Sequence, residues 1–143
     1  MQAVNLIAYK SGVTAPQILF GAHMDSVPGA PGANDNLSGS LTVLEIARRA
    51  ATTPLGTRSY FMLFDGEEDG LLGSRAFVKD NTALVGGLKA MLNFDMVGVD
   101  AAPLTVSGTA SLAETVRRAG LSARDSDMGR SDHVPFQQAG VPA

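Results

Sequence analysis

The chain has 143 residues, of which 45% are hydrophobic and 17% charged, values typical of one folded domain. Its net charge of −3 does not favour a nucleic-acid or membrane surface, and no run approaches the ~18 apolar residues of a membrane helix. The absence of cysteine excludes disulfides and thiolate zinc sites, so a metal would have to be held by His, Asp or Glu. We find no signal-peptide pattern, and expect a single soluble domain over residues 1–143.

The first half of the chain predicts strands around one helix. Apolar runs over residues 3–9 and 17–22, separated by Gly- and Pro-containing turns, predict two strands. Apolar residues at helical spacing over 37–50 predict a helix that begins just after Asp35. The continuous apolar run over 60–64 is typical of a central strand that is buried on both faces.

The second half continues the alternation of strands and helices. Apolar spacing predicts a short helix over 71–80, and the run over 88–94 predicts a strand that ends at Asp95. A short strand at 104–107 and a helix that opens with a capping box, Ser111 to Glu114, follow. Residues 131–136 have the pattern of a last helical turn. Strands that alternate with helices indicate an α/β layer structure.

Polar side chains gather where the predicted strands end. The set at or just after these ends comprises His23, Asp35, Glu67, Glu68 and Asp95, with Asp25 beside His23. Function in α/β sheets gathers at the carboxyl ends of strands, so the fold could bring these side chains together. One imidazole with several carboxylates suits a hard or borderline cation, and one of two adjacent glutamates can bind metal while the other acts as a base. The alternative is a polar loop whose acids cap helices.

Several segments around these residues resemble the zinc-dependent aminopeptidases of the M28 metallopeptidase family. The similar segments are AHMDSVP (22–28), PGANDNLSG (31–39), FDGEEDGLLGS (64–74), NFDMVG (93–98) and SDHVPF (131–136). M20 peptidases share an His-x-Asp-x-Val-Pro element and a Glu-Glu pair. Their next metal-binding aspartate, however, lies much further along the chain than Asp35 lies from His23. The resemblance to M28 is therefore favoured.

This resemblance implies a reduced three-layer α/β/α sandwich with a mixed, mostly parallel central sheet, and hydrolysis of peptides from a free N-terminus with zinc. It assigns the site residues as follows: His23 and Asp95 on one zinc, Asp35 bridging two, Glu68 on the second, Asp25 orienting His23, and Glu67 as the catalytic base. It also implies a cis peptide bond after Asp35.

The second zinc site is where the sequence departs from the family pattern. Compared with the family, the chain resembles a domain shortened at both ends, without the segment that carries the last zinc histidine. We therefore expect one or two zinc ions, a weak second site and weak activity. Three alternatives stay open for the missing donor. His133 could replace it; Asp132 and His133 could instead cap the last helix and bond to site carboxylates; or a homodimer, formed across an exposed sheet edge, could supply it.

Two other functions remain open at this stage. Glutaminyl cyclases resemble the same family and use a single zinc ion, so loss of the second site would not exclude that reaction. The chain could also be a core that binds metal or a partner without catalysis.

Overall fold

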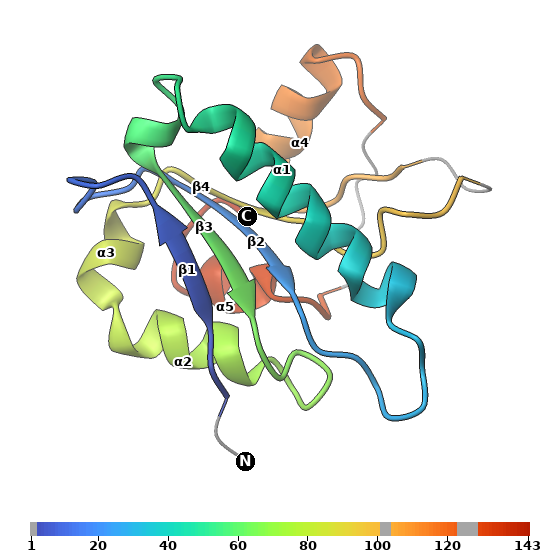
Figure 1. The fold of residues 1–143 in the computed structure, drawn as a ribbon. Helices are drawn as coiled ribbons and strands as arrows, with labels where there is room; N and C mark the ends of the chain where they lie inside the picture. The colour runs from blue at the N-terminus through green and yellow to red at the C-terminus, as the bar shows by residue number, and fades with distance from the viewer. Residues whose placement is uncertain (1–2, 101–103, 123–128) are drawn as a thin grey trace.

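Four strands form one mixed sheet in the order β1-β3-β2-β4 in this computed structural model, which describes residues 3–100, 104–122 and 129–143 (Figure 1). The strands are β1 (Leu6–Tyr9), β2 (Ile18–His23), β3 (Ser59–Phe64) and β4 (Ala90–Asn93). Both neighbours of β2 run parallel to it, and only β1 runs antiparallel. Four of the five predicted strands and the mixed, mostly parallel sheet are confirmed.

The direction of the strands places the candidate site at one edge of the sheet. The parallel strands β2, β3 and β4 all end there, at His23, Phe64 and Asn93. Residues that follow these ends are therefore brought together although they are far apart in sequence. The predicted central strand is confirmed, since β3 lies between β1 and β2 and all but one of its residues are buried.

Helices cover both faces of the sheet and make the predicted three layers (Figure 1). On one face lies α1 (Gly39–Ala50), whose Val43 packs in a cluster with Phe20 of β2 and Phe61 of β3. On the other face lie α2 (Leu72–Asp80), α3 (Thr82–Gly87) and α5 (His133–Gln138). Their core is centred on Phe136, which is fully buried and packs its ring against those of Phe64 and Phe77.

The remaining elements are short. A π-helical segment, η1 (Ala33–Ser38), precedes α1, and a 3-10 turn, η2 (Gly56–Arg58), precedes β3. Helix α4 (Ala110–Arg118) follows β4 in the chain. The C-terminal residues pair with the outer side of β4, because the Met91 N–H donates to the carbonyl of Pro142 at 2.9 Å. None of the helices in the described residues is long and apolar enough to cross a membrane.

Two local predictions are wrong in detail, and one helix was not predicted. Residues 104–107 form no strand beyond a single bridge at Val106. The expected capping box fails because Ser111 lies inside α4, where Glu114 pairs with Arg118 at 3.1 Å. Helix α3 was not predicted, since two glycines at its end obscure the apolar spacing. None of the three changes the layers or the edge that carries the candidate site.

Candidate metal centre

Two overlapping groups of metal-binding side chains lie at the carboxyl edge of the sheet. His23, Glu67 and Asp95 form one group, and His23, Asp35 and Glu68 form the other. Within each group the donor atoms all lie within 4.8 Å of one another. The five residues predicted to gather are thus brought together, and His23 is the member common to both groups.

His23 is the buried centre of this arrangement. Its side chain is 1% exposed at the end of β2, and the Ser40 hydroxyl of α1 donates to its carbonyl oxygen at 2.8 Å. The ring atom Nε2 lies 3.1 Å from Asp35 Oδ1 and 3.4 Å from Asp95 Oδ1. Burial lowers the pKa of His23, but the hydrogen bond and charge of Asp95, with the charges of Glu67 and Asp132, raise it to about 9.

Asp25 connects the end of β2 to the turn after β3. Its two carboxylate oxygens accept the backbone N–H groups of Glu67 and Glu68, each at 3.1 Å. The same carboxylate lies 3.4 Å from His23 Nδ1, while the carbonyl oxygen of Asp25 is nearer to that nitrogen, at 3.2 Å. Asp25 therefore holds the Glu67–Glu68 turn beside His23, and its backbone fixes the ring as much as its side chain does.

The two glutamates have different surroundings. Burial raises the pKa of Glu67 to about 7, with His23 opposing the shift and the charges of Asp132, Asp95 and Glu68 adding to it. Burial and the charge of Asp35 raise the pKa of Glu68 as well. A carboxyl group whose pKa lies near neutrality can take up and release a proton under physiological conditions. This property fits the role of base that the family resemblance implies for Glu67.

Asp35 is placed by its neighbour Asn36. The carboxamide of the buried Asn36 donates to the carbonyl of Phe94 at 2.9 Å and accepts the N–H of Gly39 at 3.0 Å. The peptide bond between Asp35 and Asn36 is cis, as the resemblance implies. Gly39 has no room for a side chain, because an added Cβ would overlap the Phe94 carbonyl oxygen. These contacts hold η1 against the loop after β4, which contains Phe94 and Asp95.

Asp95 is held from the other side by Ser131. The Ser131 hydroxyl donates to Asp95 Oδ2 at 2.8 Å and accepts from the Asn93 carboxamide at 2.7 Å. Burial opposes ionisation of Asp95, but its hydrogen bonds with His23 and Ser131 keep its pKa below the usual value. The sequence analysis assigned no role to Asn36 or Ser131, although both lie in segments that resemble the M28 family. Their residue types alone do not show which distant side chains they contact.

Asp132 and His133 belong to neither of the two donor groups, although their charges act on the site. Asp132 is fully buried at the N-cap of α5 but makes no capping hydrogen bond, so that expectation for its side chain is wrong. Burial raises the pKa of Asp132 to about 6, and Ser74 and His23 oppose this shift. His133 belongs to neither group of donors, although its charge lowers the pKa of Asp95.

The donor set fits a zinc ion. Glu68 Oε1 is buried and has no hydrogen-bond partner in the described residues, and the buried Asp95 Oδ1 has the His23 ring nitrogen as its neighbour at 3.4 Å; both residues belong to the groups around His23. Buried carboxylate oxygens without partners are costly unless a cation or proton satisfies them. Imidazole nitrogen and carboxylate oxygen are also ordinary zinc ligands.

Comparison with known proteins identifies the family. Residues 5–143 match the sequence profile of peptidase family M28. The chain belongs to this family. Among curated relatives, it is 37% identical to the probable lipoprotein aminopeptidase LpqL of Mycobacterium tuberculosis, over 99% of this chain and 34% of the relative. It is 36% identical to aminopeptidase YwaD of Bacillus subtilis, over 96% of this chain and 34% of the relative.

Solved structures agree with the assignment to M28. The zinc aminopeptidase BSAP of Bacillus subtilis superposes with a TM-score of 0.79 at 32% identity, over 96% of this chain and 37% of that one. A glutaminyl cyclase of Porphyromonas gingivalis shares the fold, with a TM-score of 0.76 at 24% identity, over 98% of this chain and 59% of that one. The M28 chain described here spans about a third of the length of the curated relatives it matches.

Proposed function

We propose that this M28 chain hydrolyses peptide bonds at free N-termini with the help of zinc. The observation that carries the proposal is the grouping of five candidate residues, His23 and four carboxylates, with the buried Glu68 Oε1 left without a hydrogen-bond partner in the described residues. Aminopeptidase names among the relatives and a zinc aminopeptidase among the similar structures support the same reaction.

In this proposal the residues divide the work. His23 and Asp95 would hold the first zinc, Glu68 would hold a second, and Asp35 would contribute its carboxylate to both. Asp25 keeps the turn that carries both glutamates in place through its two backbone hydrogen bonds. Bound zinc would polarise the scissile carbonyl and make the attacking water more acidic.

Glu67 moves the proton. Its carboxylate would accept a proton from the attacking water and return it to the leaving amine; in the metal-free chain, burial raises its pKa to about 7, which strengthens it as a base. The geometry also permits a second role, because Glu67 lies in the donor group with His23 and Asp95. A base and a metal ligand respond differently to replacement by glutamine, and this difference provides the test.

The experiment compares Glu67→Gln with the wild type after zinc loading. Release of p-nitroaniline from leucine p-nitroanilide measures turnover, and elemental analysis measures bound zinc. We expect turnover to fall roughly 10²- to 10⁴-fold, the usual contribution of a general base, with the zinc content unchanged. Glu114→Gln on the exposed surface of α4 is the matched control and should leave both values unchanged. Loss of zinc in Glu67→Gln would make Glu67 a ligand, and an unchanged rate would refute its catalytic role.

The zinc-loaded wild-type protein also distinguishes the two alternative functions raised in the sequence analysis, a glutaminyl cyclase and a metal-binding core without catalysis. If the chain cyclised an N-terminal glutamine and released no p-nitroaniline from the leucine substrate, its reaction would be that of a glutaminyl cyclase and the proposed hydrolysis would be rejected. The likeness to glutaminyl cyclase structures concerns the fold alone. Bound zinc with neither reaction would leave a metal-binding core without catalysis.

A further inference from the structure

Three consecutive backbone N–H groups in the loop after Asp95 donate to side chains of η1. The bonds run from Met96 to Asn36 at 3.3 Å, from Val97 to Ser38 at 3.1 Å and from Gly98 to Asn34 at 2.9 Å. We call the three acceptor side chains, those of Asn34, Asn36 and Ser38, the η1 clasp. Because its members bind successive residues, the clasp fixes the direction in which the chain leaves Asp95.

Ser38 is the central member of the η1 clasp. Its hydroxyl accepts the Val97 N–H and also donates to the carbonyl oxygen of Asn34, four residues back, at 2.7 Å. Gly98 permits this close approach, because an added Cβ would lie 2.8 Å from Ser38 Cβ and 3.2 Å from Asn34 Oδ1. One hydroxyl therefore joins η1 to the loop and holds the clasp together.

The loop has a backbone conformation that needs such support. Met96 has a φ angle of 53°, in the left-handed region that residues other than glycine rarely adopt. Its side chain is 55% exposed, so burial contributes little to holding it there. Strained backbone of this kind persists where the surroundings hold it firmly. The clasp supplies bonds to Met96 and to the two residues after it, and Asp95 comes directly before them.

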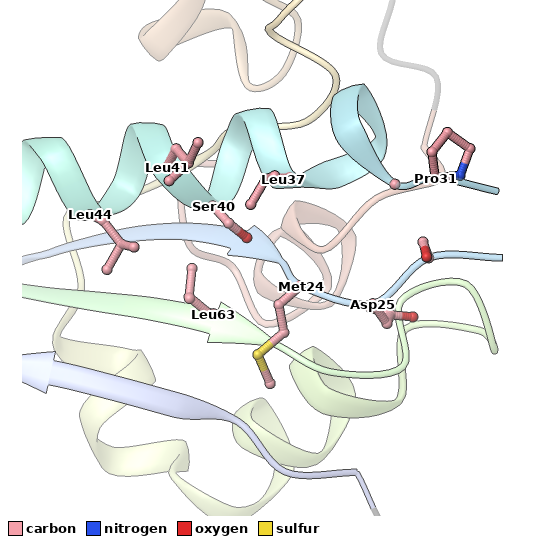
Figure 2. Close-up of a pocket in the computed structure, with 10 residues that line it drawn as sticks. Met24, Asp25, Pro31, Leu37, Ser40, Leu41, Leu44 and Leu63 are labelled. Carbon is pink, nitrogen blue, oxygen red and sulfur yellow. The ribbon is translucent and has the colours of Figure 1, made fainter. Parts of the chain in front are cut away.

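The junction of η1 and α1 holds His23 as well as this loop. Ser40, two residues after Ser38, donates to the His23 carbonyl oxygen at 2.8 Å. It lines a hollow of about 340 Å³ between α1 and the sheet, where Figure 2 shows its side chain pointing toward the end of β2. His23 and the loop after Asp95 are thus attached to the same short segment. The 3.4 Å distance between His23 Nε2 and Asp95 Oδ1 depends on that segment.

From these contacts we propose that Asn34 and Ser38 are positioning residues for the first zinc position, the one that His23 and Asp95 would share. They hold the backbone after Asp95, whereas Ser131 holds its side chain. The Asp95 carboxylate is therefore kept beside His23 before a metal binds. Ligands placed in advance bind more tightly, because less order has to be created on binding. This inference rests on the use of zinc in the proposed function.

Zinc titration of the metal-free protein, in competition with a chromogenic chelator, tests the role of Ser38. Ser38→Ala removes both bonds of the hydroxyl, and we expect the dissociation constant of the first zinc to rise about 10-fold or more. Thr115→Ala is the matched control and should bind zinc as the wild type does. Its hydroxyl also donates to a carbonyl four residues back, at 3.0 Å, but within α4.

The outcomes separate this inference from the proposed function. A wild type that binds zinc, with an unchanged dissociation constant in Ser38→Ala, would overturn the inference alone. A wild type that binds no zinc would reject the proposed function as well. Lower stability of metal-free Ser38→Ala in urea, with unchanged zinc affinity, would make the role of Ser38 structural and overturn the inference too.

A pair of variants at Asn34 provides a test that removes a single exposed bond. Asn34→Ala loses the oxygen that accepts the Gly98 N–H and should weaken zinc binding about 10-fold. Asn34→Asp keeps an acceptor oxygen and should restore the wild-type affinity. The titrations are made in 1 M salt, where the Debye length of about 3 Å screens the added charge. Equal loss of affinity in both variants would overturn the role of this bond.

A double-mutant cycle tests whether Ser38 acts through Asp95. In the Asp95→Asn background, Ser38→Ala should change the dissociation constant less than about twofold, because the ligand that it positions is already altered. In the Glu68→Gln background, the same substitution should keep its full effect, since Glu68 belongs to the other donor group. An equal effect in the two backgrounds would overturn the assignment of Ser38 to Asp95.

Discussion

Replacement of Asp25 by asparagine tests whether this side chain holds the Glu67–Glu68 turn. The carboxylate accepts two backbone N–H groups, each at 3.1 Å, and its side chain is 19% exposed. An asparagine can accept only one of them, and without charge. Hydrogen bonds to charged groups contribute about 1.5 to 3 kcal/mol each, so we expect the free energy of unfolding to fall by about 2 to 4 kcal/mol. Zinc affinity should fall roughly 10- to 100-fold, because the turn carries Glu68 and the carboxylate also lies near His23 Nδ1.

Urea unfolding of the metal-free protein and calorimetric zinc titration measure the two effects separately. Asp69→Asn is the matched control, since Asp69 is an exposed acid in the same turn and the substitution is identical. A loss of stability below about 1 kcal/mol in Asp25→Asn, the range of an ordinary neutral hydrogen bond, would contradict this account of the turn. An unchanged zinc affinity alongside the expected loss of stability would limit Asp25 to a structural role.

Two further predictions concern the packing and the protonation of the site. Gly39→Ala should lower the free energy of unfolding by about 3 kcal/mol in urea titrations, because its methyl group would overlap the Phe94 carbonyl; Gly86→Ala, with open space around it, should not. Zinc binding at pH 7.5 should release about one proton from His23, whose pKa is raised to about 9, as measured by calorimetry in buffers of different ionisation enthalpy. Because the folded pKa is raised, His23 should stabilise the metal-free protein fully below about pH 6.5, an effect lost as the pH rises through about 9. Heats independent of the buffer would contradict the proton release.

The strands could be predicted because their signals are local. The apolar run at 60–64 is bounded by polar residues, and β3 extends it by only one residue, to Ser59. The start of the first helix was harder to predict from the sequence. Its spacing predicts a helix immediately after Asp35, but α1 begins at Gly39, because Asp35 and Asn36 have non-helical backbone angles. The Asn36 contacts with Phe94 and Met96 hold that conformation, and neither contact is visible in local spacing.

The sequence was enough to predict which residues form the site, but not which hydrogen bonds hold them in place. Strand ends mark where His23, Glu67 and Asp95 lie, and parallel strands bring those ends to one edge. The support that Ser131 gives Asp95 spans 36 residues of chain and depends on how α5 packs. A serine just before a helix commonly caps it, but the Ser131 hydroxyl donates to Asp95 instead. Long-range hydrogen bonds of this kind follow from the fold and have no local sequence signal.

The two donor groups do not offer equal positions to zinc, because they share one imidazole. His23 Nε2 has a single lone pair and can bind one ion, so a second ion has the carboxylates of Asp35 and Glu68 as its donors within the two groups. Carboxylates alone favour harder cations, whereas zinc sites usually include nitrogen. The chain has only one other histidine, His133, which lies in neither group. We therefore expect the first zinc to bind more tightly than the second, and a second zinc of equal affinity would require a donor from outside both groups.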